Sequence, residues 1–241
     1  MMKSLLLLVL TFTCLSVFAQ EKNSKKDWSK IDLTNRANDH FMLQFGADSW
    51  MNKPDTIRTT GFSKFFNMYF MADKPFKNNP RFSVGIGVGI GSSNINLNKM
   101  QLDLKAAAVK ATFRIADSLD HYKKHKLTTV YLELPVELRF TTNPENSAKG
   151  WKGAIGVKVG TLLSAYTKGK GFENKNNQLI NNSIVKEKDK KFINPTKLAV
   201  TARFGTGIFS FFASYQITSV FKETAGPQVK PMSIGIALSG L

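Results

Sequence analysis

Two glutamates, Glu133 and Glu137, stand in one run of alternating sequence, and a pair of carboxylates can perform general acid–base chemistry. They are four residues apart, which on an extended strand places them on one face and roughly 13 Å apart. That separation is too large for direct paired acid–base work. Buried charges need partners, and cations occupy the matching polar positions of this and other runs. We therefore predict a structural network of ion pairs, with a proton or ion path as the alternative, made by Glu133, Glu137, Arg139, Lys158 and Arg203.

The histidines His121 and His125 are also four residues apart, a spacing that can bind a metal ion on a helix. No acidic residue of the H-E-x-x-H type lies between them, and the intervening Lys123 and Lys124 repel cations. A Ser–His–acid hydrolase would need a serine near one histidine in space, and no motif indicates one. We therefore assign no catalytic residue, no metal site and no cofactor, and we expect that the protein is not an enzyme.

Glycine repeats at alternate positions within the stretch 81–93, RFSVGIGVGIGSS. A dinucleotide-binding fingerprint requires G-x-G-x-x-G, but Ile90 stands three residues after Gly87, where the third glycine would be. The alternation is that of a β-strand with one bulky apolar face and one bare face. The interior of an eight-stranded barrel is barely wide enough for its side chains. We therefore expect the glycines to face inward and leave room for large residues opposite.

The same period of two recurs along the chain and predicts eight strands, most of them longer than the strands of a soluble sandwich. Each is long enough to cross a bilayer at a tilt. Long and short connections alternate between them, as in outer-membrane barrels. The sequence therefore predicts an all-β protein, an eight-stranded antiparallel up-and-down transmembrane β-barrel. The predicted strands are 41–48, 62–70, 82–91, 130–140, 155–164, 197–205, 209–218 and 232–239.

Two long connections, 97–126 and 168–193, are predicted on the outer side of this barrel. Within the first, 102–119 fits either a short amphipathic helix or an extension of the strands. The second is polar and rich in lysine, and its Asn-rich stretch 174–177 indicates a mobile loop. Four aromatic residues near the predicted strand ends suggest interfacial belts or ordinary packing at the rim: Trp50, Tyr69, Trp151 and Tyr166.

The chain is strongly basic, with 34 Lys and Arg against 17 Asp and Glu. A basic balance suggests an anionic partner, but an exported chain rarely meets nucleic acid, so we expect none. We expect contacts with outer-membrane lipid, with lipopolysaccharide phosphates or with a partner protein of a secretion or envelope complex. Simple solvation of loop lysines is the alternative. The residues predicted to form an external basic loop are Lys186, Lys188, Lys190 and Lys191.

The first residues have the features of a secretory signal peptide, with a positive start, an apolar stretch and a small-residue cleavage site. We predict a signal peptide over 1–19, a polar periplasmic lead over 20–39 and an outer-membrane β-barrel over 40–241. The chain's one cysteine, Cys14, falls in the predicted signal peptide. The mature chain would then form no disulfide and have no cysteine nucleophile or ligand.

Four stretches together resemble the PorT-like outer-membrane β-barrel family of Bacteroidota. They are 39–46, DHFMLQFG; 82–90, FSVGIGVGI; 131–140, YLELPVELRF; and 231–236, PMSIGI. The resemblance spans nearly the whole mature chain and implies an eight-stranded barrel in the outer membrane. PorT itself is an accessory of a secretion and gliding apparatus, and the family has no agreed catalytic residues to carry over.

Three functions fit these observations, in decreasing order of support. The first is a structural or interaction role, such as an assembly or secretion accessory. The second is a narrow channel or transporter, which predicts a conductance that changes when Glu133 or Arg139 is neutralised. The third is a lipid-modifying outer-membrane enzyme, which would need a histidine or serine on which activity depends.

Overall fold

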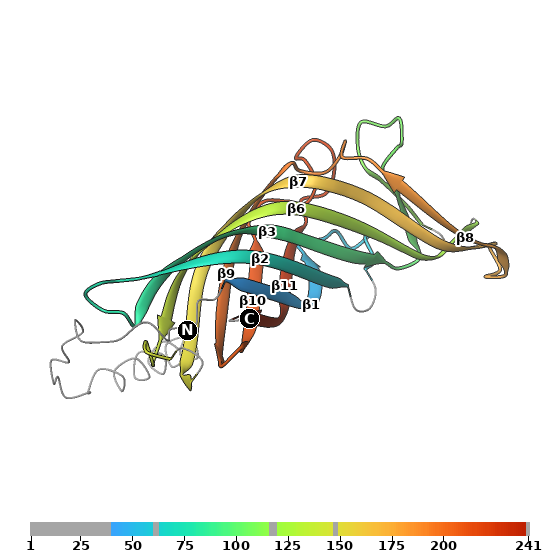
Figure 1. The fold of residues 1–241 in the computed structure, drawn as a ribbon. Helices are drawn as coiled ribbons and strands as arrows, with labels where there is room; N and C mark the ends of the chain where they lie inside the picture. Colours follow the sequence, from blue (N-terminus) through green and yellow to red (C-terminus); the bar gives the residue numbers. More distant parts are fainter. Residues whose placement is uncertain (1–39, 60–62, 116–119, 147–148, 240–241) are drawn as a thin grey trace, which may run out of the picture. The chain divides into compact units, whose positions relative to one another are not determined.

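The alternating runs of the sequence form long β-strands in the computed structural model, which describes residues 40–59, 63–115, 120–146 and 149–239. These residues belong to one compact unit, Asp32–Leu241. The predicted signal peptide and polar lead lie outside them and stay predictions. Eleven strands are described (Figure 1): β1 (Phe41–Met51), β2 (Lys64–Pro75), β3 (Phe82–Leu97), β4 (Met100–Asp103), β5 (Thr112–Ile115), β6 (His121–Thr141), β7 (Trp151–Glu173), β8 (Leu179–Lys188), β9 (Thr196–Thr206), β10 (Phe209–Gln216) and β11 (Lys230–Ser239).

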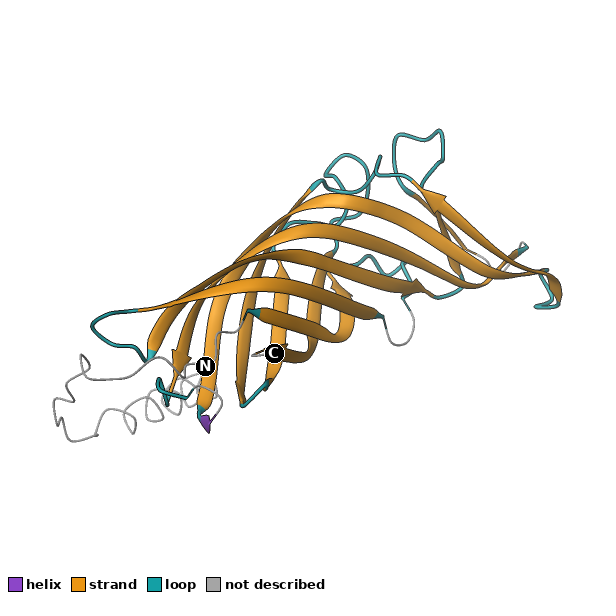
Figure 2. Cartoon of the chain, in the orientation of Figure 1, coloured by secondary structure: helices purple, strands orange, loops and turns teal. Residues whose placement is uncertain are grey.

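Eight of these strands pair in a ring. The order is β6-β3-β2-β1-β11-β10-β9-β7, and β7 pairs again with β6. All these pairings are antiparallel, and strands dominate the described chain (Figure 2). An all-β antiparallel sheet with an eight-strand ring is therefore confirmed, as a β-barrel requires. The strand count differs from the prediction, because β4, β5 and β8 lie outside the ring.

The two faces of the ring strands differ in polarity, because successive side chains of a strand point to opposite sides. On β3, Ile86, Val88 and Ile90 are exposed, whereas Gly85 and Gly91 are buried. Exposed apolar side chains occur on all eight ring strands, and we call them the apolar band. Its members include Phe45, Phe66, Phe70, Ile86, Val88, Ile90, Leu132, Leu134, Val136, Leu138, Ile155, Val157, Val159, Leu163, Val200, Phe204, Phe209, Phe211, Ile234 and Ile236.

Both long connections contain more strand than expected. Residues 100–103 and 112–115 pair as a hairpin, so within 102–115 the structure has strand and turn and no helix; residues 116–119 lie outside the described chain. The polar connection predicted over 168–193 is largely strand, and the mobile loop predicted at 174–177 falls on the turn between β7 and β8. β7 continues to Glu173 and β8 pairs back onto it (Figure 1). In the extended part of β7, small or polar buried residues alternate with lysines. The sequence therefore shows no apolar face that would indicate a strand.

Apolar side chains from the long connections gather at the end of the ring where β4, β5 and β8 lie, and we call this cluster the apolar cap. Phe221 is fully buried and its ring lies 5.8 Å from those of both Trp50 and Phe113. Further members are Ile57, Leu97, Met100, Leu102, Leu104, Leu127, Phe192, Ile193, Val220 and Val229. The cap thus gives the connections above the ring a hydrophobic core of their own.

Of the four aromatic residues expected in interfacial belts or in packing at the rim, two are buried and do not form a belt. Trp50 is 3 % exposed within the apolar cap, and Tyr69 is 1 % exposed inside the ring. Both side chains occupy inward-facing positions of their strands. The alternation of faces along a strand therefore decides their placement, more than their closeness to a strand end does. Trp151 is 56 % exposed and stacks on Phe204, with ring centroids 5.2 Å apart, while Tyr166 is half-buried.

None of the helical segments in the described ranges is long and apolar enough to cross a membrane.

Candidate functional site

Glycines on two neighbouring strands create the space in which the interior charges lie. Glu133 stands between Gly89 of β3 and Gly160 of β7, and Glu137 stands in the same way between Gly85 and Gly156. A Cβ atom on Gly85 would collide with the guanidinium of Arg139. One on Gly91 would collide with the carboxylate of Glu133. The glycines therefore face inward beside large charged residues, as the sequence predicted.

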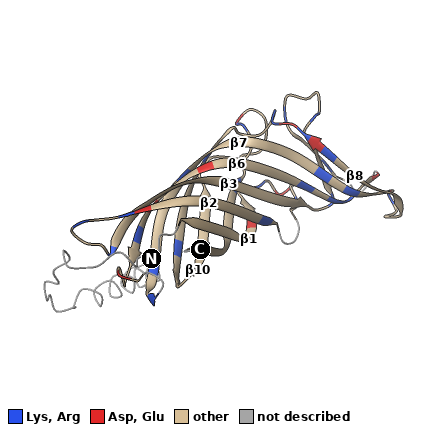
Figure 3. Cartoon of the chain, viewed as in Figure 1, with Lys and Arg blue, Asp and Glu red and all other residues tan. Residues whose placement is uncertain are grey.

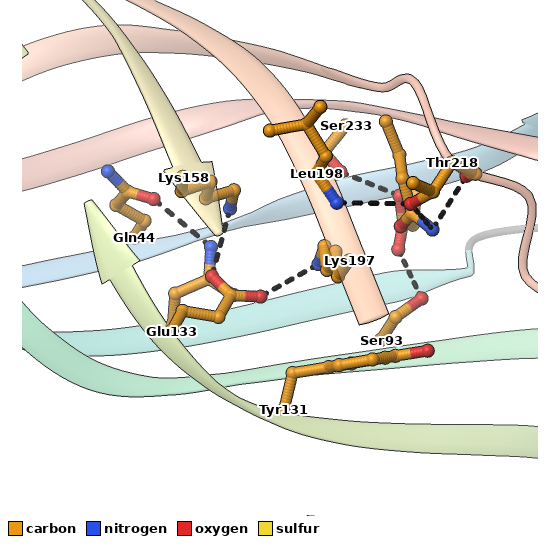
Figure 4. Close-up of polar contacts among 12 residues, drawn as sticks. Gln44, Ser93, Tyr131, Glu133, Lys158, Lys197, Leu198, Thr218 and Ser233 are labelled. Atoms are coloured by element: carbon orange, nitrogen blue, oxygen red, sulfur yellow. Dashed lines mark hydrogen bonds and ion pairs between the residues drawn. The ribbon is translucent and has the colours of Figure 1, made fainter. Parts of the chain in front are cut away.

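The first interior cluster is built around Glu133, which is fully buried. Lys197 Nζ lies 2.8 Å from Glu133 Oε1, and Lys158 Nζ lies 3.3 Å from Oε2 (Figure 4). The Tyr69 hydroxyl donates a hydrogen bond of 2.5 Å to Oε2 and accepts one of 3.3 Å from Lys158. This carboxylate is thus held by two ammonium groups and one phenol.

The second interior cluster is built around Glu137. Arg203 contacts both carboxylate oxygens, with Nη2–Oε2 at 2.6 Å and Nε–Oε1 at 3.2 Å, and Arg139 Nε donates to Oε2 at 3.0 Å. Arg139 also reaches Asp73, with Nη1–Oδ1 at 3.4 Å, and Ser83 donates to the same oxygen at 2.7 Å. Charge-assisted bonds of this bidentate type are the strong ones among protein hydrogen bonds.

Both clusters connect strands that lie opposite each other. Tyr69 and Asp73 are on β2, and Lys197 and Arg203 are on β9, four places away in the ring of eight. Glu133, from β6, joins Tyr69 to Lys197, while the second cluster joins Asp73 to Arg203. The charges therefore bridge the interior from wall to wall.

Several further polar side chains of the interior are also hydrogen-bonded. Asp48 accepts bonds from the hydroxyls of Ser93 and Ser233, and Asn67 donates to Gln44 at 3.0 Å. The pocket that Asp48 lines together with Lys158, Lys197 and Tyr131 has a volume of about 10 Å³. That is room for about one water molecule.

All five charges predicted for the interior are buried there, in two clusters instead of one network. The prediction missed Lys197, Asp73 and Tyr69. Lys197 and Tyr69 had a signal, because each stands on the polar face of its alternating run. Asp73 gave no such signal, because the predicted strand ended at residue 70, whereas β2 runs to Pro75.

The two histidines lie apart from these clusters, in the part of β6 that extends past the apolar band. His121 Nε2 lies 4.0 Å from Glu173, which also pairs with Lys123 at 3.3 Å. His125 Nε2 accepts a hydrogen bond of 3.2 Å from the Leu102 amide. Burial lowers the pKa of His125, and the Leu102 carbonyl, 3.3 Å from Nε2, opposes this in part because it can accept a hydrogen bond from the protonated ring. His125 therefore joins β6 to the β4–β5 hairpin as a neutral side chain.

The four lysines of the predicted external basic loop are exposed, but they do not act as one group. Lys186 and Lys188 belong to β8. Lys190 donates to the Leu162 carbonyl at 3.4 Å. Lys191 donates to the carbonyls of Ala106 at 3.4 Å and Ala108 at 2.9 Å, so these two lysines tie neighbouring segments together.

A comparison with known families matches residues 18–221 to the outer membrane protein beta-barrel domain, and no curated protein matches the chain. The matched region contains most of the ring and both interior clusters. The chain therefore belongs to the outer membrane protein beta-barrel domain family, and its location is the outer membrane.

Proposed function

We propose that this protein is an eight-stranded up-and-down barrel that crosses the outer membrane, has a closed interior and serves a structural or interaction role. The observation that carries the proposal is the pair of ion clusters that bridge β2 and β9 under the apolar cap. The apolar band supports the membrane-spanning part, because barrel strands present apolar residues to lipid.

A closed interior favours a role at the surface over transport. The space beside Lys158 and Lys197 admits about one water, and Glu133 holds both of these lysines in ion pairs. The channel hypothesis remains the alternative and predicts a discrete conductance. The third hypothesis, a lipid-modifying enzyme, gains no support from His121 and His125, whose contacts are to Glu173 and Leu102.

The partners we propose are outer-membrane lipid, including lipopolysaccharide phosphates, and a partner protein of an assembly or secretion complex. Two features support them: the resemblance of four stretches to the PorT-like family, and the strands β6, β7 and β8 that project past the apolar band (Figure 1). The family match supports the outer-membrane barrel on which these contacts depend.

The test is the native mass of the tagged protein after gentle extraction from outer membranes, with co-purifying chains identified. The proposal predicts a stable assembly larger than the 26.9 kDa chain, present in equal ratio across independent preparations. A lone barrel with no co-purifying chain would contradict the accessory role and leave a self-contained function.

A further inference from the structure

Six lysines lie in rows across three neighbouring strands, and we call them the lysine ladder: Lys124, Lys126, Lys168, Lys170, Lys186 and Lys188. In one row Lys126 of β6 is opposite Lys168 of β7, which is opposite Lys186 of β8. In the next row Lys124 is opposite Lys170. Figure 3 shows these blue segments on β6, β7 and β8 where the strands extend past the rest of the ring.

The ladder lies on the same face as the apolar band. Lys124 and Lys126 have the strand parity of Leu132 and Leu134, which are exposed on the outside of β6. Directly opposite residues share a face of a sheet, so the β7 and β8 lysines face outward as well. On β6 the outward positions thus change from apolar to cationic within a few residues, with Tyr166 of β7 at the boundary.

The ladder has no acidic partner among the residues that the structure describes. Lys126 donates to Asn94 Oδ1 at 2.9 Å, and Lys186 Nζ lies 3.9 Å from the centre of the Tyr166 ring. Glu187, the acidic neighbour on β8, stands at the opposite parity and lines the pocket on the inner side with His125. Like charges directly opposite one another destabilise a sheet, and an external polyanion would relieve this repulsion.

We propose that the lysine ladder binds the phosphorylated headgroup of lipopolysaccharide in the outer leaflet. The occupant must carry several negative charges next to acyl chains, because the cationic rows adjoin the apolar band on one continuous surface. Lipopolysaccharide has this arrangement, with phosphates for the lysines and acyl chains for side chains such as Leu132 and Leu163. The inference rests on the proposed membrane-spanning barrel and names the residues of its lipid contact.

The test compares lipopolysaccharide binding by the purified, delipidated full chain and by two charge-matched variants. The ladder variant replaces Lys124, Lys168, Lys170 and Lys186 with Gln and keeps Lys126, which bonds to Asn94. The control variant replaces four other exposed lysines with Gln: Lys105, Lys110, Lys175 and Lys222. Binding of rough lipopolysaccharide and of its dephosphorylated form is measured by titration in detergent, with native mass spectrometry to count the bound molecules.

Each lysine near an anionic lipid surface contributes about fivefold in affinity, so the ladder variant is expected to bind roughly several hundredfold more weakly. The control variant should bind like the wild type, the dephosphorylated lipid should bind weakly, and added salt should weaken binding. A Lys→Arg version of the ladder variant should retain binding, because it keeps the four charges.

A loss of less than about tenfold in the ladder variant, or an equal loss in the control variant, would overturn the proposal. Equal binding of phosphatidylglycerol would overturn the choice of lipopolysaccharide. The heat-dependent gel mobility of folded barrels shows that each variant has folded. A negative result for lipopolysaccharide binding is distinguishable from a failure of the proposed function, because the closed interior is tested by conductance and not by lipid binding.

Discussion

Replacing Glu133 with Gln tests the interior network at its centre. The substitution keeps the shape of the side chain and removes its charge. Lys158 is 4 % exposed, and the two ammonium groups, on Lys158 and Lys197, lie 3.3 and 2.8 Å from the carboxylate. After the substitution both would remain inside the ring and would have lost the counter-charge that pairs with them directly.

The expected cost follows from the burial of the three charges. Removing one partner of a buried ion pair lowers the free energy of unfolding by about 3–5 kcal/mol, since the remaining charge is left uncompensated. Two cations are left here, whereas the amide of Gln can still accept the hydrogen bond from Tyr69. We therefore expect a loss of about 3–5 kcal/mol, a large share of the about 5–15 kcal/mol typical of a domain.

The assay is equilibrium unfolding in urea with the protein inserted in lipid vesicles, followed by tryptophan fluorescence. The matched control is Glu223→Gln, because Glu223 is exposed and should change the free energy of unfolding by less than about 0.5 kcal/mol. Adding Lys158→Met to Glu133→Gln should restore part of the loss, since one orphaned cation is removed. A Glu133→Gln protein within about 1 kcal/mol of the wild type would refute the reasoning.

Three further predictions concern the space around Gly91, the titration of His125 and the packing of the apolar cap. Gly91→Leu should cost about 1–3 kcal/mol or more, because its Cβ meets the Glu133 carboxylate, whereas a Cβ on Gly153 has its nearest neighbours at an ordinary contact distance of 3.9 Å, so Gly153→Leu should cost less. His125 has a pKa below its ordinary value of 6.5. Its contribution to stability is therefore present above about pH 6.5 and is lost as pH falls through the folded-state pKa. The protection factors of the β4–β5 hairpin amides, which correct the exchange rate for its intrinsic pH dependence, should accordingly fall as the pH is lowered from 7.5 to 5.5. Phe221→Ala should cost about 3–5 kcal/mol and expose the long connections to protease.

Each of these three has a result that would count against it. For the glycine, it is equal stability of the Gly91 and Gly153 variants. For His125, it is a pH response of the hairpin that persists in a His125→Gln variant, which has no titrating group at that position. For the cap, it is a Phe221→Ala protein that unfolds and resists protease like a Phe211→Ala protein, whose altered side chain is 77 % exposed.

The sequence predicted which residues face the interior, because side chains alternate between the two faces of a strand and the face in contact with lipid must be apolar. Gly85, Glu133 and Arg203 were placed inward on this basis alone. The partners of each charge could not be predicted in the same way. Parity gives the face of a residue, but its height in the ring depends on the stagger between strands, which sequence does not reveal. Hence Lys197 was overlooked as the partner of Glu133.

The extended strands were missed for a different reason. Past the apolar band neither face of a strand is required to be apolar, so Thr167 and Gly169 can be buried beside exposed lysines without any hydropathy signal. The end of β7 and all of β8 were therefore predicted as a polar connection, and for 102–119 an extension of the strands was one of two alternatives. For the same reason the lysine ladder appears only when the register of β6, β7 and β8 is known.

Single-channel recording in planar lipid bilayers shows whether the interior is closed. With a closed interior, the purified protein inserts without discrete conductance steps. Reproducible unitary steps would mean that the interior is open, above all if Glu133→Gln or Arg139→Gln changed their size, because the interior charges would then line an open path for ions.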